Sequence, residues 1–205
     1  MVGKFLITKY YSYGFFGFCK LISDYIKTKI FYFNSRLIRS PLYIRGRKSI
    51  NLGKNLTTGV GLRLNALGED LNLKKITIGD NVQINDYCHI AAIKNVSIGD
   101  NTLIASRVFI SDHNHGIYRG FESSNPDSNP LFRVDEIREV LIGKNVWIGE
   151  SVIILPGVVL GDGVVVGAGS VVTKSFPSHS LVVGNPAKIL KKFNKHTGEW
   201  EREKK

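Results

Sequence analysis

The sequence predicts an all-β chain wound into a parallel β-helix, and three features of its second half indicate this. Aliphatic residues recur at every sixth position, and a second apolar or small column follows four residues after each of them. Turn-forming residues rich in glycine, asparagine and aspartate separate these positions. A period of six fits neither an α-helix nor a single strand, but it matches a solenoid whose short rungs stack around a shared core. The first column consists of Ile142, Ile148, Ile154, Leu160, Val166 and Val172.

The N-terminal segment, residues 1–43, is aromatic and basic. Apolar residues from Phe18 to Phe33 recur at three- and four-residue spacings, which predicts an amphipathic helix over roughly residues 14–33. The longest uncharged run of this segment, Tyr10 to Cys19, has ten residues, whereas a membrane-spanning helix needs about 20. No small-residue cleavage site follows it, so we expect neither a spanning helix nor a secretory signal. The helix either caps the first coil or lies on an anionic membrane through residues 14–33, and the two roles are compatible.

The six-residue period extends through a domain that we assign to residues 44–186. Three units make one coil, so that Ile142 and Leu160 lie eighteen residues apart. Ile78 and Ile98 are twenty residues apart, which predicts a two-residue bulge near residues 93–95. Cys88 falls in an inward column and is expected to be a small core residue.

One long insertion interrupts the period at residues 111–140. Ile110 and Ile142 are thirty-two residues apart, which is one unit of six plus twenty-six. The insertion opens with Asp112, His113, Asn114 and His115, and it continues through a stretch rich in serine, asparagine and proline. Long loops in compact domains are usually functional or disordered. We therefore expect functional residues at the start of this insertion. The alternative is a surface loop without a function.

The net charge of +11 lies at the two ends of the chain. Residues 1–50 carry ten basic residues against one acidic residue, and the segment 187–205, expected to be a basic tail, carries seven against three. These give +9 and +4, so the remaining residues carry −2. A nucleic-acid-binding face along the coil would need a basic body, so we expect no nucleic-acid partner. Two cysteines give no sign of an oxidising compartment. We expect a cytoplasmic protein, in peripheral contact with the inner face of the cytoplasmic membrane if the helix binds lipid.

Four motifs of the later coils resemble the hexapeptide-repeat acyltransferases. The resemblance is closest to the galactoside, maltose and nodulation-factor O-acetyltransferases and to their relatives in O-antigen and capsule biosynthesis. It implies a left-handed β-helix, the opposite of the usual right-handed crossover. It also implies a homotrimer with active sites between subunits, acetyl-CoA as acyl donor and no metal. The motifs are Asn145–Gly149, Ile154–Gly157, Gly167–Lys174 and Val183–Lys188.

The resemblance also assigns roles to individual residues. His115 matches the general base, because histidine titrates near neutral pH and an alcohol needs a base to attack a thioester. His113 is the second candidate, and Asp112 is a candidate partner for the ring of the base. Asn85 matches a residue that binds the acceptor sugar, although asparagine is also common at plain corners. The residues expected to bind coenzyme A are Trp147, Gly149, Gly167, Ala168, Thr173, Lys174, Lys188 and Lys191.

Glu150 departs from the family pattern, which has alanine or serine at that corner. The donor that stabilises the oxyanion is therefore unassigned, with backbone N–H groups as the default. No serine or cysteine lies in a nucleophile motif, so we expect direct transfer rather than an acyl-enzyme.

The expected function is acetyl-CoA-dependent O-acetyl transfer to a sugar hydroxyl of a surface polysaccharide, O-antigen or capsule, or of its precursor. One alternative is N-acetylation of an amino sugar. A second is a γ-type carbonic anhydrase, which holds zinc with three histidines. The spacing of His89, His113 and His115 does not match that enzyme. A third alternative is a non-catalytic β-helix module.

Overall fold

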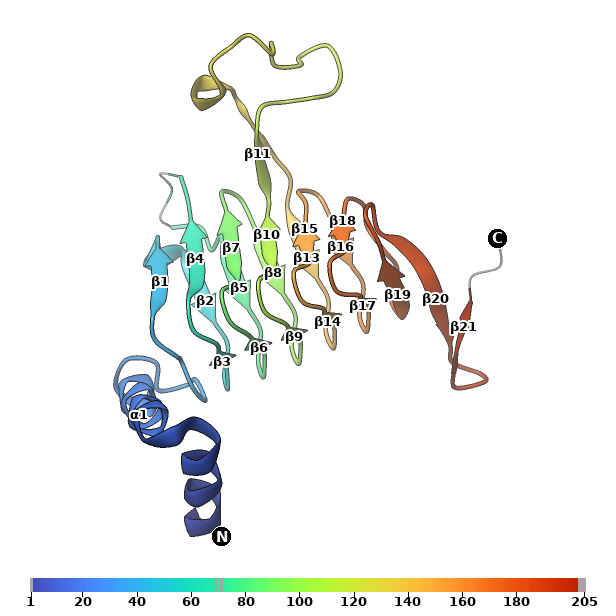
Figure 1. Ribbon diagram of the computed structural model, residues 1–205. Helices are drawn as coiled ribbons and strands as arrows, with labels where there is room; N and C mark the ends of the chain where they lie inside the picture. The colour runs from blue at the N-terminus through green and yellow to red at the C-terminus, as the bar shows by residue number, and fades with distance from the viewer. Residues whose placement is uncertain (1, 69, 71, 203–205) are drawn as a thin grey trace.

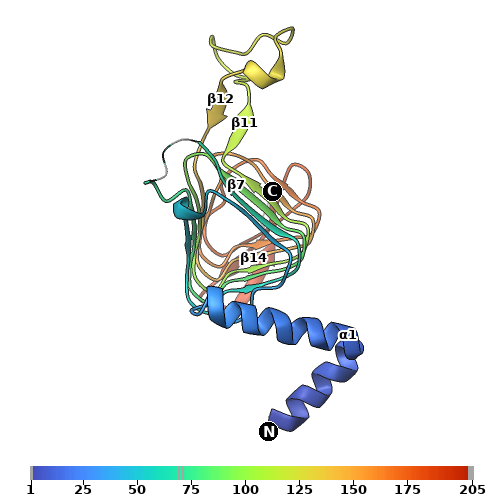
Figure 2. The same ribbon diagram turned by 90° about the vertical axis from the view of Figure 1, so that its left-hand side faces the viewer.

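The computed structural model describes residues 2–68, 70 and 72–202, with side chains from residue 11 onward. Its centre is a triangular coil of parallel strands that form three faces (Figures 1 and 2). Seen from the N-terminal end in Figure 2, the chain turns anticlockwise as it recedes. The β-helix is therefore left-handed, as the resemblance implied.

Successive turns of the coil place their strands on the first, second and third faces in that order. The first face contains β1 Leu42–Arg45, β4 Leu62–Ala66, β7 His89–Ala92, β10 Phe109–Ser111, β15 Ile153–Ile154 and β18 Val171–Val172. The second face contains β2 Ile50–Leu52, β5 Ile76–Ile78, β8 Val96–Ile98, β13 Val140–Ile142 and β16 Val159–Leu160. The third face contains β3 Thr57–Thr58, β6 Gln83–Ile84, β9 Leu103–Ile104, β14 Trp147–Ile148, β17 Val165–Val166 and β19 Ser180–Val183. A short 3₁₀ helix, Arg47–Ser49, precedes β2.

The coil has three corners, one at each junction between faces. The upper corner joins the first face to the second, and the lower corner joins the third face to the first. The Asn corner joins the second face to the third. In Figure 1 the strands of the first face point towards the upper corner.

The predicted inward columns fill the core. All six residues of the first column are buried, and so are the residues predicted upstream at Ile78, Ile84 and Ile98. Parallel pairing keeps the columns in register, for example Ile84 beside Ile104. Each fully buried aliphatic side chain contributes about 1.5–3 kcal/mol relative to exposure, so the six-residue period is the main source of stability. Cys88 lies in this core, and burial raises the pKa of its thiol to about 11.

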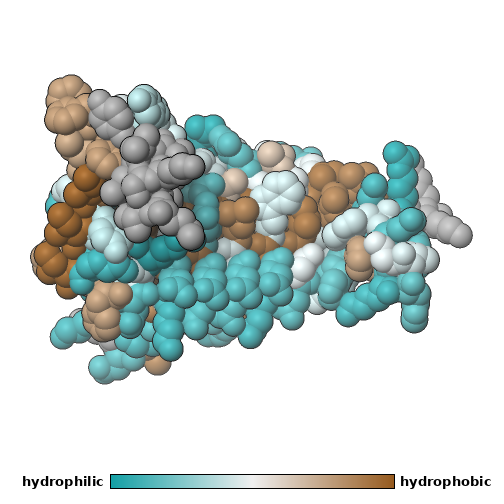
Figure 3. All heavy atoms as spheres, turned by 90° about the horizontal axis from the view of Figure 1, so that it is seen from below, coloured by the Kyte–Doolittle hydropathy of each residue, from teal (hydrophilic) through white to brown (hydrophobic). Residues whose placement is uncertain are grey.

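Stacked asparagines form the Asn corner. Asn55, Asn81, Asn101 and Asn145 all have a positive φ near 57°, a conformation that asparagine tolerates better than most residues. The Asn55 amide donates to the Asn81 side chain at 3.0 Å, and the Asn81 amide donates to Asn101 at 3.2 Å. The hydrophilic band that runs along the coil in Figure 3 follows this corner.

The insertion begins as a hairpin that projects from the upper corner (Figure 1). Its strands, β11 His113–His115 and β12 Asp135–Ile137, pair antiparallel, and a short 3₁₀ helix, Pro130–Phe132, lies in the loop between them. The bulge predicted near residues 93–95 is confirmed, because β5 and β8 pair Ile78 with Ile98 across the two extra residues.

Helix α1, Val2–Phe31, is longer than the predicted span and is kinked at Gly14, where φ is 66° and ψ is 176°. It attaches to the coil by Asp24 and Thr28, which are buried, and the Thr28 hydroxyl accepts the N–H of Ile38 at 2.8 Å. Within the described part of the chain, no helix is both long and apolar enough to cross a membrane.

The apolar stripe of α1 points away from the coil. Its most exposed members are Ile22, Tyr25, Ile26 and Ile30 of the helix and Phe33 just beyond it, with 42–72% of their surface exposed. The contact between α1 and the first coil is made by Asp24 and Thr28, so the stripe itself does not cover the coil. Figure 3 shows apolar side chains gathered at the end of the molecule that carries α1.

A basic tail was expected at 187–205, but the described part of this segment, which ends at Arg202, forms a hairpin. Strands β20 Lys188–Asn194 and β21 Glu199–Arg202 pair antiparallel and extend the third face beyond β19. The rings of Phe193 and Trp200 pack across this hairpin with their centroids 5.5 Å apart.

Candidate active site

Asp112 is fully buried at the upper corner, where the insertion leaves the first face. Its carboxylate accepts the backbone N–H groups of Ile93, Lys94 and Asn95, at 2.7–3.1 Å. Burial alone would raise the pKa of this carboxyl. The hydrogen bonds from His113 and from the three amides outweigh burial and hold the pKa below its usual value. Asp112 is therefore an ionised group that fastens the bulge to the root of the insertion.

His113 is bound to that carboxylate. Its Nδ1 lies 2.8 Å from Asp112 Oδ1, and 3.3 Å from the hydroxyl of Ser111. Only 12% of its side chain is exposed. An ionised carboxylate at Nδ1 selects the tautomer with the proton on Nδ1 and leaves Nε2 as the free acceptor.

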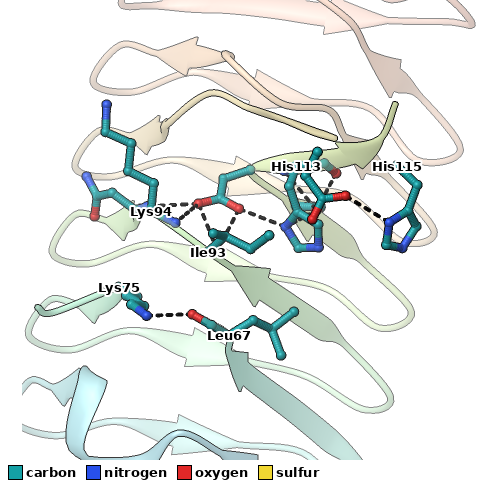
Figure 4. A network of polar contacts seen from close by, with 10 residues as sticks. Leu67, Lys75, Ile93, Lys94, His113 and His115 are labelled. Atoms are coloured by element: carbon teal, nitrogen blue, oxygen red, sulfur yellow. Dashed lines mark hydrogen bonds and ion pairs between the residues drawn. The ribbon is translucent and has the colours of Figure 1, made fainter. Parts of the chain in front are cut away.

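His115 has a carboxylate partner of its own, and the sequence analysis missed it. The antiparallel pairing of β11 and β12 sets His115 opposite Asp135, and Nδ1 lies 2.9 Å from Asp135 Oδ1. The side chain of His115 is 70% exposed. Figure 4 shows the two histidines next to each other at the root of the hairpin, and their ring centroids are 6.4 Å apart.

The upper corner therefore presents two carboxylate–histidine pairs. Asp112 contacts His113, so it does not directly orient His115. The hydroxyl of Tyr118 donates to the backbone carbonyl of His115 at 2.6 Å, which adds a further contact within the insertion. Either Nε2 can accept a proton, but only His115 offers a largely exposed ring to a substrate.

Asn85 lies at the lower corner, on the other side of the first face from the histidines. It borders a hollow of 210 Å³ that is also lined by Arg39, Asp86 and Ser106. Its side-chain carbonyl accepts the amide of Gln83 at 2.9 Å. Asn85 can therefore still donate through its own amide to a group in the hollow.

Most of the residues expected to bind coenzyme A follow the third face and the lower corner. Trp147 is 51% exposed on β14, and Lys191 of β20 lies beside Leu181 in the same sheet. Gly149 and Gly167 both lie at the lower corner, in neighbouring coils. A Cβ at Gly149 would lie 2.6 Å from the backbone nitrogen of Ala168, so only glycine allows these coils to stack. Lys188 begins β20 and is exposed.

Two of the expected residues lie apart from this group. Thr173 and Lys174 follow β18 and so occupy the upper corner, the same corner as the histidines. The Lys174 ammonium lies 5.8 Å from the ring centre of Phe176. Within one chain, the residues expected to form the site therefore lie at two corners, the upper and the lower, which are separated by the first face.

Glu150, the departure from the family pattern, forms an ion pair with Arg107 at the lower corner. A carboxylate only accepts hydrogen bonds, so Glu150 cannot polarise a thioester carbonyl as a hydroxyl would. Among the described residues, no group of three or more His, Cys, Asp or Glu side chains is arranged to hold a metal ion.

Comparison with known proteins identifies the family of the chain. The family model described as "Bacterial transferase hexapeptide (six repeats)" matches residues 139–174. The chain is 51% identical over 191 residues to "Putative lipopolysaccharide biosynthesis O-acetyl transferase WbbJ" of Escherichia coli (strain K12), covering 93% of this chain and 95% of that protein.

Solved structures share the fold. A maltose O-acetyltransferase from Clostridium difficile 630 superposes with a TM-score of 0.59 at 29% identity, covering 85% of this chain and 89% of that chain. A mutant of the N-acyltransferase AntD from Bacillus cereus, in complex with dTDP and coenzyme A, gives a TM-score of 0.66 at 25% identity, with coverages of 84% and 90%. The chain therefore belongs to the hexapeptide-repeat acyltransferase family, in its acetyl-CoA-dependent O-acetyltransferase branch.

Proposed function

We propose that the protein transfers the acetyl group of acetyl-CoA to a sugar hydroxyl of lipopolysaccharide O-antigen, of another surface polysaccharide or of its precursor. The observation that carries this proposal is the pair of carboxylate-bound histidines at the root of the insertion, in a chain so similar to an O-acetyl transferase of lipopolysaccharide biosynthesis.

We assign the general base to His115, with Asp135 as the carboxylate that orients it. The Nδ1–H of His115 donates to Asp135, which leaves Nε2 to take the proton of the sugar hydroxyl. The hydroxyl oxygen then forms a bond to the thioester carbonyl carbon, and the carbon–sulfur bond breaks. The proton returns from Nε2 to the thiolate, giving free coenzyme A and the O-acetyl ester. A positioned base contributes about 10²–10⁴ in rate.

The donor binds along the lower corner and the third face. Trp147, Gly149, Gly167 and Ala168 would contact coenzyme A there, with Lys188 and Lys191 near its phosphates. Lysine acts on phosphate as a point charge, without the two-pronged geometry of arginine. Asn85, at the same corner, would donate to the acceptor sugar.

We propose a homotrimer in which each site lies between two subunits. The supporting observation is the division of the expected residues between the upper and lower corners of one chain, with the first face between them. The upper corner of one subunit, with His115, Thr173 and Lys174, would then face the lower corner of its neighbour.

We also propose that α1 holds the enzyme on the inner face of the cytoplasmic membrane. The apolar stripe is exposed, and Lys20, Lys27 and Lys29 lie on the same helix. Apolar side chains with flanking lysines suit an anionic lipid surface.

The experiment that tests the assignment of the base is a comparison of His115→Ala with His113→Ala. Thiol release from acetyl-CoA would be measured with purified surface-glycan repeat units as acceptor. We expect kcat to fall by about 10²–10⁴ for His115→Ala, with acetyl-CoA affinity near that of the natural protein. The loss for His113→Ala should be smaller, since this ring is buried against Asp112. A larger loss for His113→Ala would move the role to His113.

A further inference from the structure

An open hollow lies on the outer surface of the first face, at its N-terminal coils. Its volume is about 720 Å³, within the range of small-molecule sites. Strands β1 and β4 form it, and it is lined by Leu42, Tyr43, Ile44, Arg45, Arg63 and Asn65. None of the residues assigned above to the base, the acceptor sugar or coenzyme A lines it.

The charge of the hollow is positive. Arg45 and Arg63 project from neighbouring strands, and no acidic side chain is among the lining residues. Within the described part of the chain, neither guanidinium group has an ion-pair or hydrogen-bond partner. Two free guanidinium groups beside a tyrosine and an asparagine form a set of donors suited to a phosphate or diphosphate, which arginine binds in a bidentate manner.

Two rows of side chains on the first face lead from this hollow towards the histidines. Arg63 lies beside His89 on the next strand, and the Asn65 side-chain nitrogen lies 2.9 Å from His89 Nε2. Burial lowers the pKa of His89, and the charge of Arg63 lowers it further. His89 is thus a neutral ring between the arginine and His113. Along the neighbouring row, Arg45, Asn65, Ala91 and Ser111 occupy successive strands, and Ser111 contacts His113.

Three strand spacings, each about 4.8 Å, therefore separate the Arg45 position from the Ser111 position. A bound molecule with an anionic group at the arginines could extend along the first face towards the upper corner. Its sugar would then approach the two carboxylate–histidine pairs.

We propose that the hollow formed by Tyr43, Arg45, Arg63 and Asn65 binds the phosphate or diphosphate of an activated acceptor. The inference rests on the proposed function and adds a substrate class to it: the acceptor is a sugar still joined to a phosphate ester. A nucleotide sugar and a polyprenyl-linked sugar share that group, and the experiment separates them.

The test is calorimetric titration of the full chain with inorganic pyrophosphate, with excess coenzyme A present to fill the donor site. The substitutions Arg45→Gln and Arg63→Gln should each raise the Kd for pyrophosphate about tenfold, which corresponds to the loss of one hydrogen bond to a charged group. Lys54→Gln removes one exposed positive charge at the Asn corner and is the matched control. Circular dichroism would verify that each variant is folded.

Two further titrants identify the source of the phosphate. Tighter binding of dTDP than of pyrophosphate would indicate a nucleotide-linked acceptor, and tighter binding of farnesyl diphosphate would indicate a polyprenyl-linked one. Equal affinity for all three would show that the diphosphate alone is recognised. Each of these outcomes supports the site only if it depends on both arginines.

Pyrophosphate binding that is absent, or that is equal in the natural protein and both arginine variants, would overturn the proposal. Thiol release is measured separately. Arginine-dependent binding without acetyl transfer would refute the proposed function and leave the site standing. Acetyl transfer with arginine-independent binding would refute only the site.

Discussion

Replacing Asp112 by asparagine should destabilise the fold strongly, and the hydrogen bonds give the magnitude. Oδ1 accepts from Ile93 and His113, and Oδ2 accepts from Lys94 and Asn95. Asparagine is neutral and has one oxygen. With its NH₂ group towards His113 it keeps the three amides only if the His113 proton moves from Nδ1 to Nε2, and with its NH₂ group turned the other way it opposes the N–H groups of Lys94 and Asn95. A hydrogen bond to a charged group contributes about 1.5–3 kcal/mol and one to a neutral group about 0.5–1.5 kcal/mol, so removing the charge from four such bonds should lower the free energy of unfolding by about 2–5 kcal/mol.

The same substitution should change the pH dependence of stability. The pKa of Asp112 is lowered in the folded state, so its contribution is fully present above the unfolded pKa of about 3.9. The contribution is lost as pH falls through the folded value. The stability gap between the natural protein and Asp112→Asn should therefore be full at pH 7 and should narrow below about pH 4.

Urea unfolding, followed by tryptophan fluorescence at a fixed protein concentration, measures this gap. Asp127→Asn, an exposed carboxylate in the insertion, is the matched control, and such surface changes stay within about 0.5 kcal/mol. The reasoning is refuted if Asp112→Asn matches that control at pH 7, or if the gap keeps its full size well below pH 4.

Three further predictions concern assembly, metal and membrane. Light scattering should give about three times the 22.8 kDa chain mass, and a fully active monomer would contradict the shared site. Acetyl transfer should survive EDTA, because among the described residues no third ligand joins His113 and His115 to complete a metal site; loss of activity that zinc restores would contradict this. The paired substitution Ile26→Asp and Ile30→Asp should abolish sedimentation with anionic vesicles. Val134→Asp, an exposed apolar position in the insertion, should leave sedimentation intact, and equal binding by both variants would refute the lipid contact.

The coil could be predicted from the sequence because its period is local. Each six-residue unit indicates which side chain turns inward, so the period alone places Ile84 and Val166 in the core. The bulge at residues 93–95 was visible as two extra residues. Its cause, the carboxylate of Asp112 inside a ring of amides, was not visible, because that contact joins positions seventeen to nineteen residues apart.

Features outside the period were harder to predict. Asp135 lies twenty residues from His115, and only the pairing of β11 with β12 brings them together. The basic segment 187–205 has no six-residue period, so the sequence predicts an irregular tail rather than the hairpin of β20 and β21. The spacing of apolar residues predicts an apolar face on α1 but not which surface that face contacts. The helix contacts the coil through Asp24 and Thr28, two polar residues that lie outside this pattern.

The most direct test of the central claim follows the acetyl group to its product. Acetyl-CoA labelled with ¹³C in the acetyl group would be incubated with surface-glycan repeat units, and the product would be analysed by NMR before and after mild alkali. We predict one acetyl signal on a sugar hydroxyl, removed by alkali and absent when His115→Ala replaces the natural protein. An alkali-stable acetyl on a sugar nitrogen would contradict O-acetyl transfer, and transfer at the natural rate by His115→Ala would contradict the role of the base.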